Sequence, residues 1–333
     1  MTRLHRREFL SRAATAAAAC GLAACRRHGS GGLVLRLSHS MAAGATALDV
    51  MAERFRERLE ALTEGTARVH VFPNGTLGQE REVVQQLQEG LVDLMVSGTA
   101  IWGSVAPRIQ VLDFPFLWRD YAHVHSVVDG AVGAEAAAYL ESAARIRPLA
   151  WADSFGFRQV ITRSRDVTEA AQLAGLKIRT IQSPIYVKAI ELMGASPTPM
   201  AFGEIYTSLQ TGVIDGYEHD ASTTLQQRFY EVARYMARTR HIAGVLGLFA
   251  SAASLSRIPA ELRTALEEAA REASALQRAM GPTEDEDATQ RLRAQGMTIR
   301  DTDRSAFFGP AERLWQEQAA QLGAASWLAA IRG

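Results

Sequence analysis

The sequence predicts an α/β protein of two lobes, and three observations support this. From residue 33 onward, segments with the alternating apolar pattern of strands are interleaved with segments of helical periodicity. The chain has 333 residues, which is too long for one simple core. Residues 260–295 form one helical pattern, roughly 50 Å long at 1.5 Å per residue. Because this length exceeds one lobe, we expect the helix to brace both.

The elements follow one another in a regular order. The segments expected first are strand 33–38, helix 46–63, strand 68–72, helix 80–89 and strand 91–97. Those expected next are helix 121–140, strands 147–152, 157–163 and 175–180, helices 184–193 and 202–211, strand 214–217 and helix 260–295. Gly281-Pro282 should bend the last helix. This alternation predicts sheets of the parallel type.

Residues 1–25 have the features of an export signal. Arg6-Arg7 resembles the twin-arginine signal, and a short Ala-rich run at 13–19 follows it. The run is shorter than the ~20 residues of a membrane-spanning helix. Leu22-Ala23-Ala24-Cys25 resembles a lipoprotein box, in which Cys25 would carry the lipid. Alternatively, Cys25 is incidental and cleavage occurs near Ala24.

The rest of the chain has the composition of an exported soluble body. Residues 1–24 contain four arginines and one glutamate, so the remainder has 32 basic and 35 acidic residues, a net charge of −3. This charge gives no reason to expect nucleic-acid binding. Cys20 leaves with the signal, so neither an internal disulfide nor a cysteine metal site is expected. Residues 26–32, RRHGSGG, would form a flexible tether.

Several stretches, all in order along residues 33–320, carry a resemblance to a known family. They are VFPNGTLG at 71–78, VLDFPFL at 111–117, GLKIR at 175–179, GASPTPM at 194–200, FGEIY at 202–206, GVIDG at 212–216 and FYEV at 229–232. Together they resemble the solute-binding subunit of tripartite ATP-independent periplasmic (TRAP) transporters, the DctP-like family.

The resemblance implies a two-lobed periplasmic binding protein, type II-like, with a strand hinge and a long helix across both lobes. We expect one lobe at 33–152 and 242–281 and the other at 153–241 and 282–333. It further implies a monomer that uses no cofactor and catalyses no reaction. It would close on a small organic acid, such as a sugar acid or a hydroxy or keto acid, and deliver it to the small and large TRAP membrane subunits.

Residues 175–180, GLKIRT, contain the principal candidate for the binding site. On an alternating strand, Lys177 and Arg179 share the face opposite Leu176 and Ile178. In the family, the arginine of this stretch grips the carboxylate of the solute, and that position is Arg179. A guanidinium is planar, always charged and able to give a carboxylate two parallel hydrogen bonds. The alternative is a surface arginine that pairs with a nearby acid.

Further ligand candidates each have a structural alternative. By resemblance, Arg158 would be a second arginine in the site or an interlobe salt bridge, and Phe202 would lie against the ligand or pack in the core. Other candidates follow predicted strands, at the edge where α/β proteins bind ligands. These are Thr99, Trp102, which would stack or pack, and His39, which is equally typical of a core histidine. Glu80 would accept from solute hydroxyls or favour the start of a helix.

Residues 215–220, DGYEHD, depart from the family pattern. Many members have asparagine at the position of His219, where it contacts the acid end of the ligand. A histidine there would donate a hydrogen bond and, when protonated, add charge near a dianion. Tyr217 and Asp220 are also unusual, and Glu218 or Asp220 would accept from amine or hydroxyl groups.

Two other functions remain open for these residues. Some family members hold a metal ion with a glutamate at the position of Glu218, and carboxylates suit Ca²⁺ or Na⁺ better than zinc. A hydrolase or lyase would use His219 with Asp215 or Glu218 as acid and base. However, the sequence has no Gly-x-Ser-x-Gly elbow and no phosphate-binding loop. A ligand sensor for a membrane receptor would have the same residues as a transport protein.

Overall fold

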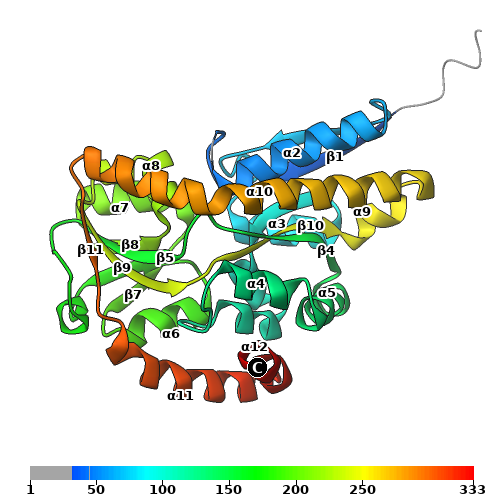
Figure 1. Ribbon diagram of the computed structural model, residues 1–333. Helices are drawn as coiled ribbons and strands as arrows, with labels where there is room; N and C mark the ends of the chain where they lie inside the picture. Colours follow the sequence, from blue (N-terminus) through cyan, green and yellow to red (C-terminus); the bar gives the residue numbers. More distant parts are fainter. Residues whose placement is uncertain (1–31, 45) are drawn as a thin grey trace, which may run out of the picture.

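The computed structural model describes residues 32–44 and 46–333. The export signal, Cys25 and all of the tether but Gly32 therefore lie outside the described residues. Figure 1 shows two α/β lobes side by side, with the long helix α10 running along both. This arrangement confirms the predicted fold class.

The first lobe is built on a five-stranded sheet of order β2-β1-β3-β10-β4. β1 is parallel to β2 and β3, whereas β10 runs antiparallel to β3 and β4. Its elements are β1 (Leu33–Ser38), α2 (Ala47–Leu62), β2 (Ala67–Phe72), α3 (Glu80–Glu89), β3 (Leu94–Gly98), α4 (Tyr121–Val128), α5 (Ala131–Ala144), β4 (Ile146–Asp153), β10 (Val245–Ser251) and α9 (Ala252–Arg257). Two 3₁₀ segments, Thr99–Ser104 and Pro107–Asp113, follow β3.

The second lobe is built on a six-stranded sheet of order β11-β9-β5-β8-β6-β7. β6 is parallel to β7 and β8, and β5 is antiparallel to β8 and β9. Its elements are β5 (Arg158–Thr162), β6 (Lys177–Thr180), α6 (Pro184–Leu192), β7 (Ser196–Pro199), α7 (Ile205–Thr211), β8 (Gly216–His219), α8 (Ala221–Gln226), β9 (Tyr235–Ile242) and β11 (Thr298–Asp301). The expectation of parallel-type sheets is therefore only partly confirmed. Parallel pairs join β1 to β2 and β3, β6 to β7 and β8, and β9 to β11, whereas β5 and β10 run antiparallel to their neighbours.

The two lobes are connected by two crossing segments and by α10 (Ala260–Ala294). The chain crosses from β4 to β5 at residues 154–157 and from β9 to β10 at Ala243-Gly244. Gly156 and Gly244 have φ values of 126° and 68°, in the region that favours glycine. α10 packs against α2 and β4 of the first lobe and against α8 of the second. It continues as one helix through Pro282.

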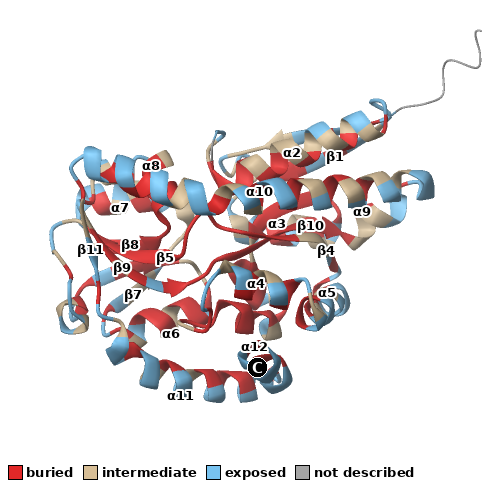
Figure 2. Ribbon diagram, viewed as in Figure 1, coloured by how far each residue is buried: buried red, intermediate tan, exposed pale blue. Residues whose placement is uncertain are grey.

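The packing follows the predicted apolar stripes. In α2, Met51, Phe55 and Leu59 are buried against the first sheet, and Thr46 caps the helix by accepting from Asp49 N at 3.3 Å. Figure 2 shows buried faces turned towards the sheets and exposed faces towards solvent. The expected helix 121–140 is two helices, because it is interrupted at Asp129-Gly130 and glycine is a poor helix former.

The chain ends with α11 (Ser305–Gln321) and α12 (Ala325–Arg332), which return to the first lobe. Trp327 of α12 is buried and its Nε1 donates to Glu135 Oε2 of α5 at 2.6 Å. His123 Nε2 of α4 lies 2.8 Å from Ile331 O. The expected division assigned all of 282–333 to the second lobe, so the position of α12 differs from it. Packing of Trp327, rather than proximity in sequence, determines where this helix lies.

Candidate ligand-binding site between the two lobes

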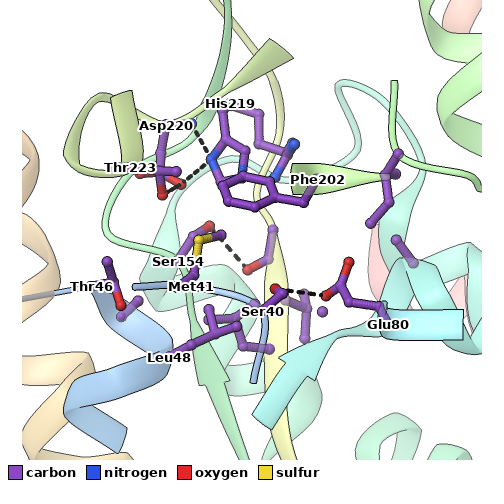
Figure 3. Close-up of a pocket in the computed structure, with 18 of the residues that line it drawn as sticks. Ser40, Met41, Thr46, Leu48, Glu80, Ser154, Phe202, His219, Asp220 and Thr223 are labelled. Carbon is purple, nitrogen blue, oxygen red and sulfur yellow. Dashed lines mark hydrogen bonds and ion pairs between the residues drawn. The ribbon is translucent and has the colours of Figure 1, made fainter. Parts of the chain in front are cut away.

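A cavity lies between the lobes, beside the crossing segments. Its empty volume is about 620 Å³, including the mouth. Figure 3 shows Ser40, Met41, Leu48 and Glu80 of the first lobe on one side. Phe202 and His219 of the second lobe lie on the other side, and Arg158 and Arg179 also line the cavity. Its lining combines apolar side chains with a few charged and polar groups, which is typical of a site for a small molecule.

Arg179 is the most unusual charge in this cavity. It is only 1% exposed, and its Nε and Nη2 donate to Met200 O at 3.1 and 2.8 Å. Within residues 32–44 and 46–333, no carboxylate forms an ion pair with it. Burial lowers the pKa of Arg179 to about 10. The carbonyl holds one edge of the guanidinium, which leaves Nη1 with donors for an anion.

Arg158, in contrast, has a carboxylate partner within the protein. Its Nε lies 2.5 Å from Glu218 Oε2, and its Nη2 donates to Glu218 Oε1 and O at 2.9 Å. Both side chains are buried. Burial alone would raise the pKa of Glu218, but Arg158 and His241 lower it to about 2. His241 Nε2 lies 3.5 Å from Glu218 Oε2. This pair fixes Arg158 within the second lobe.

The two lobes also contact each other through a buried carboxyl group. Asp113 Oδ2 of the first lobe accepts from Thr99 Oγ1 at 2.8 Å, and its Oδ1 accepts from Tyr186 Oη of α6 at 3.3 Å. Burial raises the pKa of Asp113 to about 7. The Tyr186 ring lies 5.3 Å from the Arg158 guanidinium, within cation–π distance. Tyr186 therefore links Asp113 of the first lobe to the surroundings of Arg158.

His219 and Phe202 form the wall contributed by the second lobe (Figure 3). Their rings lie edge to face, with centroids 5.7 Å apart. His219 Nδ1 is 2.8 Å from Asp220 Oδ2. Burial and the nearby Arg158 cation lower the pKa of His219, although Asp220 opposes them. The imidazole is therefore neutral near pH 7.

Glu80 supplies a carboxylate from the opposite wall. It is the first residue of α3, and its Oε1 accepts from Ser40 Oγ at 3.2 Å (Figure 3). Burial raises the pKa of Glu80, and Arg179 and the Ser40 hydroxyl act in the opposite direction. Glu80 thus faces the cavity in addition to lying at a helix start.

The structure places five other candidates behind the cavity wall. Four of them have side-chain polar groups that are hydrogen-bonded within the protein, whereas the ring nitrogens of His39 have no hydrogen-bond partner among residues 32–44 and 46–333. Thr99 bonds Asp113, Trp102 Nε1 donates to Ser97 Oγ at 3.1 Å, Tyr217 Oη donates to Thr224 Oγ1 at 2.9 Å, His39 Nε2 lies 3.2 Å from Asp49 Oδ1, and Glu218 pairs with Arg158. Buried polar groups require such partners, so these side chains support the wall.

Sequence reasoning missed several lining residues. Ser40 and Met41 come just after β1, and Tyr186 lies on α6. Ser40 could have been predicted, because it lies just after the first predicted strand, as His39 does. Tyr186 had no such signal, since its place depends on how α6 packs against the other lobe. Within the described part of the chain, no group of histidine and acidic side chains is arranged to hold a metal ion.

Comparison with known proteins decides the family. Residues 37–322 match the family described as bacterial extracellular solute-binding protein, family 7 (DctP). The chain belongs to this family. It is therefore a solute-binding protein of the TRAP type, and membership confirms the expectation that it is not an enzyme. The DctP-family assignment also places it in the periplasm. No helix in residues 32–44 and 46–333 has the length and apolar character needed to cross a bilayer.

Three relatives illustrate the DctP family. The 2,3-diketo-L-gulonate-binding periplasmic protein YiaO of Escherichia coli is 33% identical over 259 residues, 78% of each chain. The C4-dicarboxylate-binding periplasmic protein DctP of Rhodobacter capsulatus is 30% identical over 307 residues, 90% of each chain. A TRAP periplasmic solute-binding protein from Chromohalobacter salexigens, with bound D-glucuronate, has a TM-score of 0.85 at 28% identity. That comparison covers 90% of this chain and 99% of the other.

Proposed function

We propose that the chain captures a small organic acid by binding its carboxylate at Arg179. The observation that carries this proposal is a guanidinium that is 1% exposed, faces the cavity and forms no ion pair with a described residue. A buried charge without a counter-ion is costly. A solute carboxylate would supply that counter-ion and accept from Nη1. Strand β6 and Met200 O hold the guanidinium in place beforehand.

Closure of the lobes is the proposed mechanism. Arg179, Phe202 and His219 come from the second lobe, whereas Ser40 and Glu80 come from the first. The solute would dock on Arg179 in an open form, and the first lobe would then close over it. A solute that contacts both walls binds the closed form more tightly, so it shifts the equilibrium towards closure.

The same proposal covers delivery and membrane attachment. The closed form would be recognised by the small and large TRAP membrane subunits, which the family implies. We further propose twin-arginine export through Arg6-Arg7 and lipidation at Cys25, which lie outside the described residues. The protein would then act as a monomer tethered to the membrane by its lipid.

A thermal-shift screen tests the carboxylate requirement. The probes are D-glucuronate, D-erythronate and 2-keto acids, each compared with its neutral amide, and the protein is residues 32–333. An acid at 100 times its Kd should add about 2.7 kcal/mol to the free energy of unfolding. We expect at least one acid to raise the melting temperature and its amide to have no effect. Equal shifts with acid and amide would contradict the proposal.

A further inference from the structure

His219 lies between the cavity and a carboxylate of its own lobe. Its Nδ1 is 2.8 Å from Asp220 Oδ2, and the backbone N–H of Asp220 is directed at the same Nδ1 with an N···N distance of 3.0 Å. The carboxylate is itself fixed, because Oδ1 accepts from Thr223 N at 2.7 Å and Oδ2 accepts from Thr223 Oγ1 at 3.1 Å. The side chain of His219 lines the cavity, and its Nε2 has no hydrogen-bond partner among residues 32–44 and 46–333.

The two contacts make opposite demands on Nδ1, because the Asp220 N–H requires a lone pair there and the Asp220 carboxylate requires a hydrogen. If Nδ1 carried none, its lone pair would meet a carboxylate oxygen at 2.8 Å. If Nδ1 carries the hydrogen, the contact is a charge-assisted hydrogen bond, which is stronger than a bond from the neutral amide of Asp220. A neutral imidazole has one N–H only. Nε2 therefore has no hydrogen and presents a lone pair to the cavity.

The groups around the cavity now divide into donors and acceptors. Arg179 is the guanidinium without a carboxylate partner among the described residues, whereas Arg158 is paired with Glu218. Glu80 on one wall and His219 Nε2 on the other are acceptors. A solute therefore meets a cation at one place and hydrogen-bond acceptors elsewhere.

We infer that His219 and Glu80 select a polyhydroxy monocarboxylate over the corresponding dicarboxylate. This inference rests on the proposed function, because it requires the carboxylate at Arg179. Hydroxyl groups away from that carboxylate would donate to His219 Nε2 and to Glu80. A second carboxylate there would have no proton to give and would face a lone pair and like charge. The family relatives do not decide this, since their names include a diketo sugar acid and C4-dicarboxylates.

Matched solutes test the selectivity. D-glucarate differs from D-gluconate, and meso-tartrate from D-erythronate, by a second carboxylate at one terminal carbon. Titration calorimetry on residues 32–333 measures the Kd of both solutes in each pair. In a pair that binds, the monocarboxylate should have a Kd lower by about 10-fold or more. Equal or tighter binding of the dicarboxylate would overturn the inference.

Asp220→Asn tests the role of the hydrogen position. Thr223 N–H would keep the amide oxygen at the site of Oδ1, so the NH₂ would face Nδ1 and donate to it. The ring hydrogen would then move to Nε2, and the preference for the monocarboxylate should fall about 10-fold. Asp166→Asn, at an exposed ion pair with Arg300, is the matched control and should not change it. An unchanged preference in Asp220→Asn would contradict the assignment.

A ¹⁵N nuclear magnetic resonance spectrum tests this inference independently of the proposed function. The ¹⁵N signals of His219, identified by their loss in His219→Gln, report which nitrogen carries the hydrogen in the full described chain. We expect hydrogen on Nδ1 in the wild type, with or without solute, because His219 and Asp220 belong to the same lobe. Hydrogen on Nε2 would overturn the inference. If no acid bound, the proposed carboxylate site at Arg179 would be contradicted. The spectrum would still show which tautomer His219 adopts.

Discussion

At the scale of single residues, the site depends on which buried charges have partners. Arg158 and Glu218 form a buried ion pair, so their charges offset each other and the pair attracts a solute anion less than an unpaired guanidinium does. Among the residues that the structure describes, Arg179 bonds only the Met200 carbonyl. The sequence pointed to Arg179 through a family motif and to Arg158 with a salt bridge as the alternative. It could not show which arginine was free, because Glu218 is 60 residues from Arg158.

Asp113 should make stability depend on pH. The folded protein keeps this carboxyl protonated up to about pH 7, whereas the unfolded chain releases the proton near pH 3.8. The folded state binds more protons between these values, so its free energy of unfolding falls as pH rises through this window. Urea unfolding from pH 4 to 7.5 should show wild type losing roughly 3 kcal/mol more than Asp113→Asn.

The control for this comparison is Asp129→Asn, which changes an exposed carboxylate paired with Arg278. Its pH profile should follow that of wild type. If the free energy of unfolding changed with pH in the same way for wild type and Asp113→Asn, Asp113 would be ionised in the folded protein at pH 4 and above.

At the scale of elements, α10 positions the strand that leads into the lobe crossing. Gln277 is fully buried; its Oε1 accepts from Asp153 N at 3.2 Å, and its Nε2 donates to Asp153 O. Ser274 donates to Trp151 O. β4 is the edge strand of its sheet, so these side chains take the place of a neighbouring strand. The sequence predicted the length of α10, but it could not show that two polar residues face β4.

Gln277→Leu should therefore destabilise the protein. It would leave the buried N–H and C=O of Asp153 without partners, which we expect to cost about 3 kcal/mol in urea unfolding. Gln290→Leu on the same helix is the matched control, because Gln290 is exposed and bonds only Glu286 among the described residues. It should change stability by less than about 0.5 kcal/mol. Equal effects of the two variants would show that the contact with β4 contributes nothing.

At the scale of the whole molecule, the sequence predicted the two lobes and the brace but not the antiparallel strands or the final helix. Strand and helix periodicity is a local property, visible in a few consecutive residues. The antiparallel return through β9 and β10, and the docking of α12 on α5, depend on contacts far apart in sequence. The same limit applies to the cavity, where Tyr186 reaches Asp113 of the other lobe.

The central claim is that Arg179 anchors a solute carboxylate in a cavity that both lobes close. The most direct measurement is titration calorimetry of the tightest acid from the thermal-shift screen against wild type, Arg179→Lys, Arg179→Gln and Arg300→Gln. Arg300 is the control, since it lies on the edge strand β11 and pairs with exposed Asp166. Loss of the charged partner should cost roughly 2–5 kcal/mol of binding free energy in Arg179→Gln. Arg179→Lys should recover part of that loss, and Arg300→Gln should bind as wild type does. Unchanged affinity in a folded Arg179→Gln protein would contradict the claim.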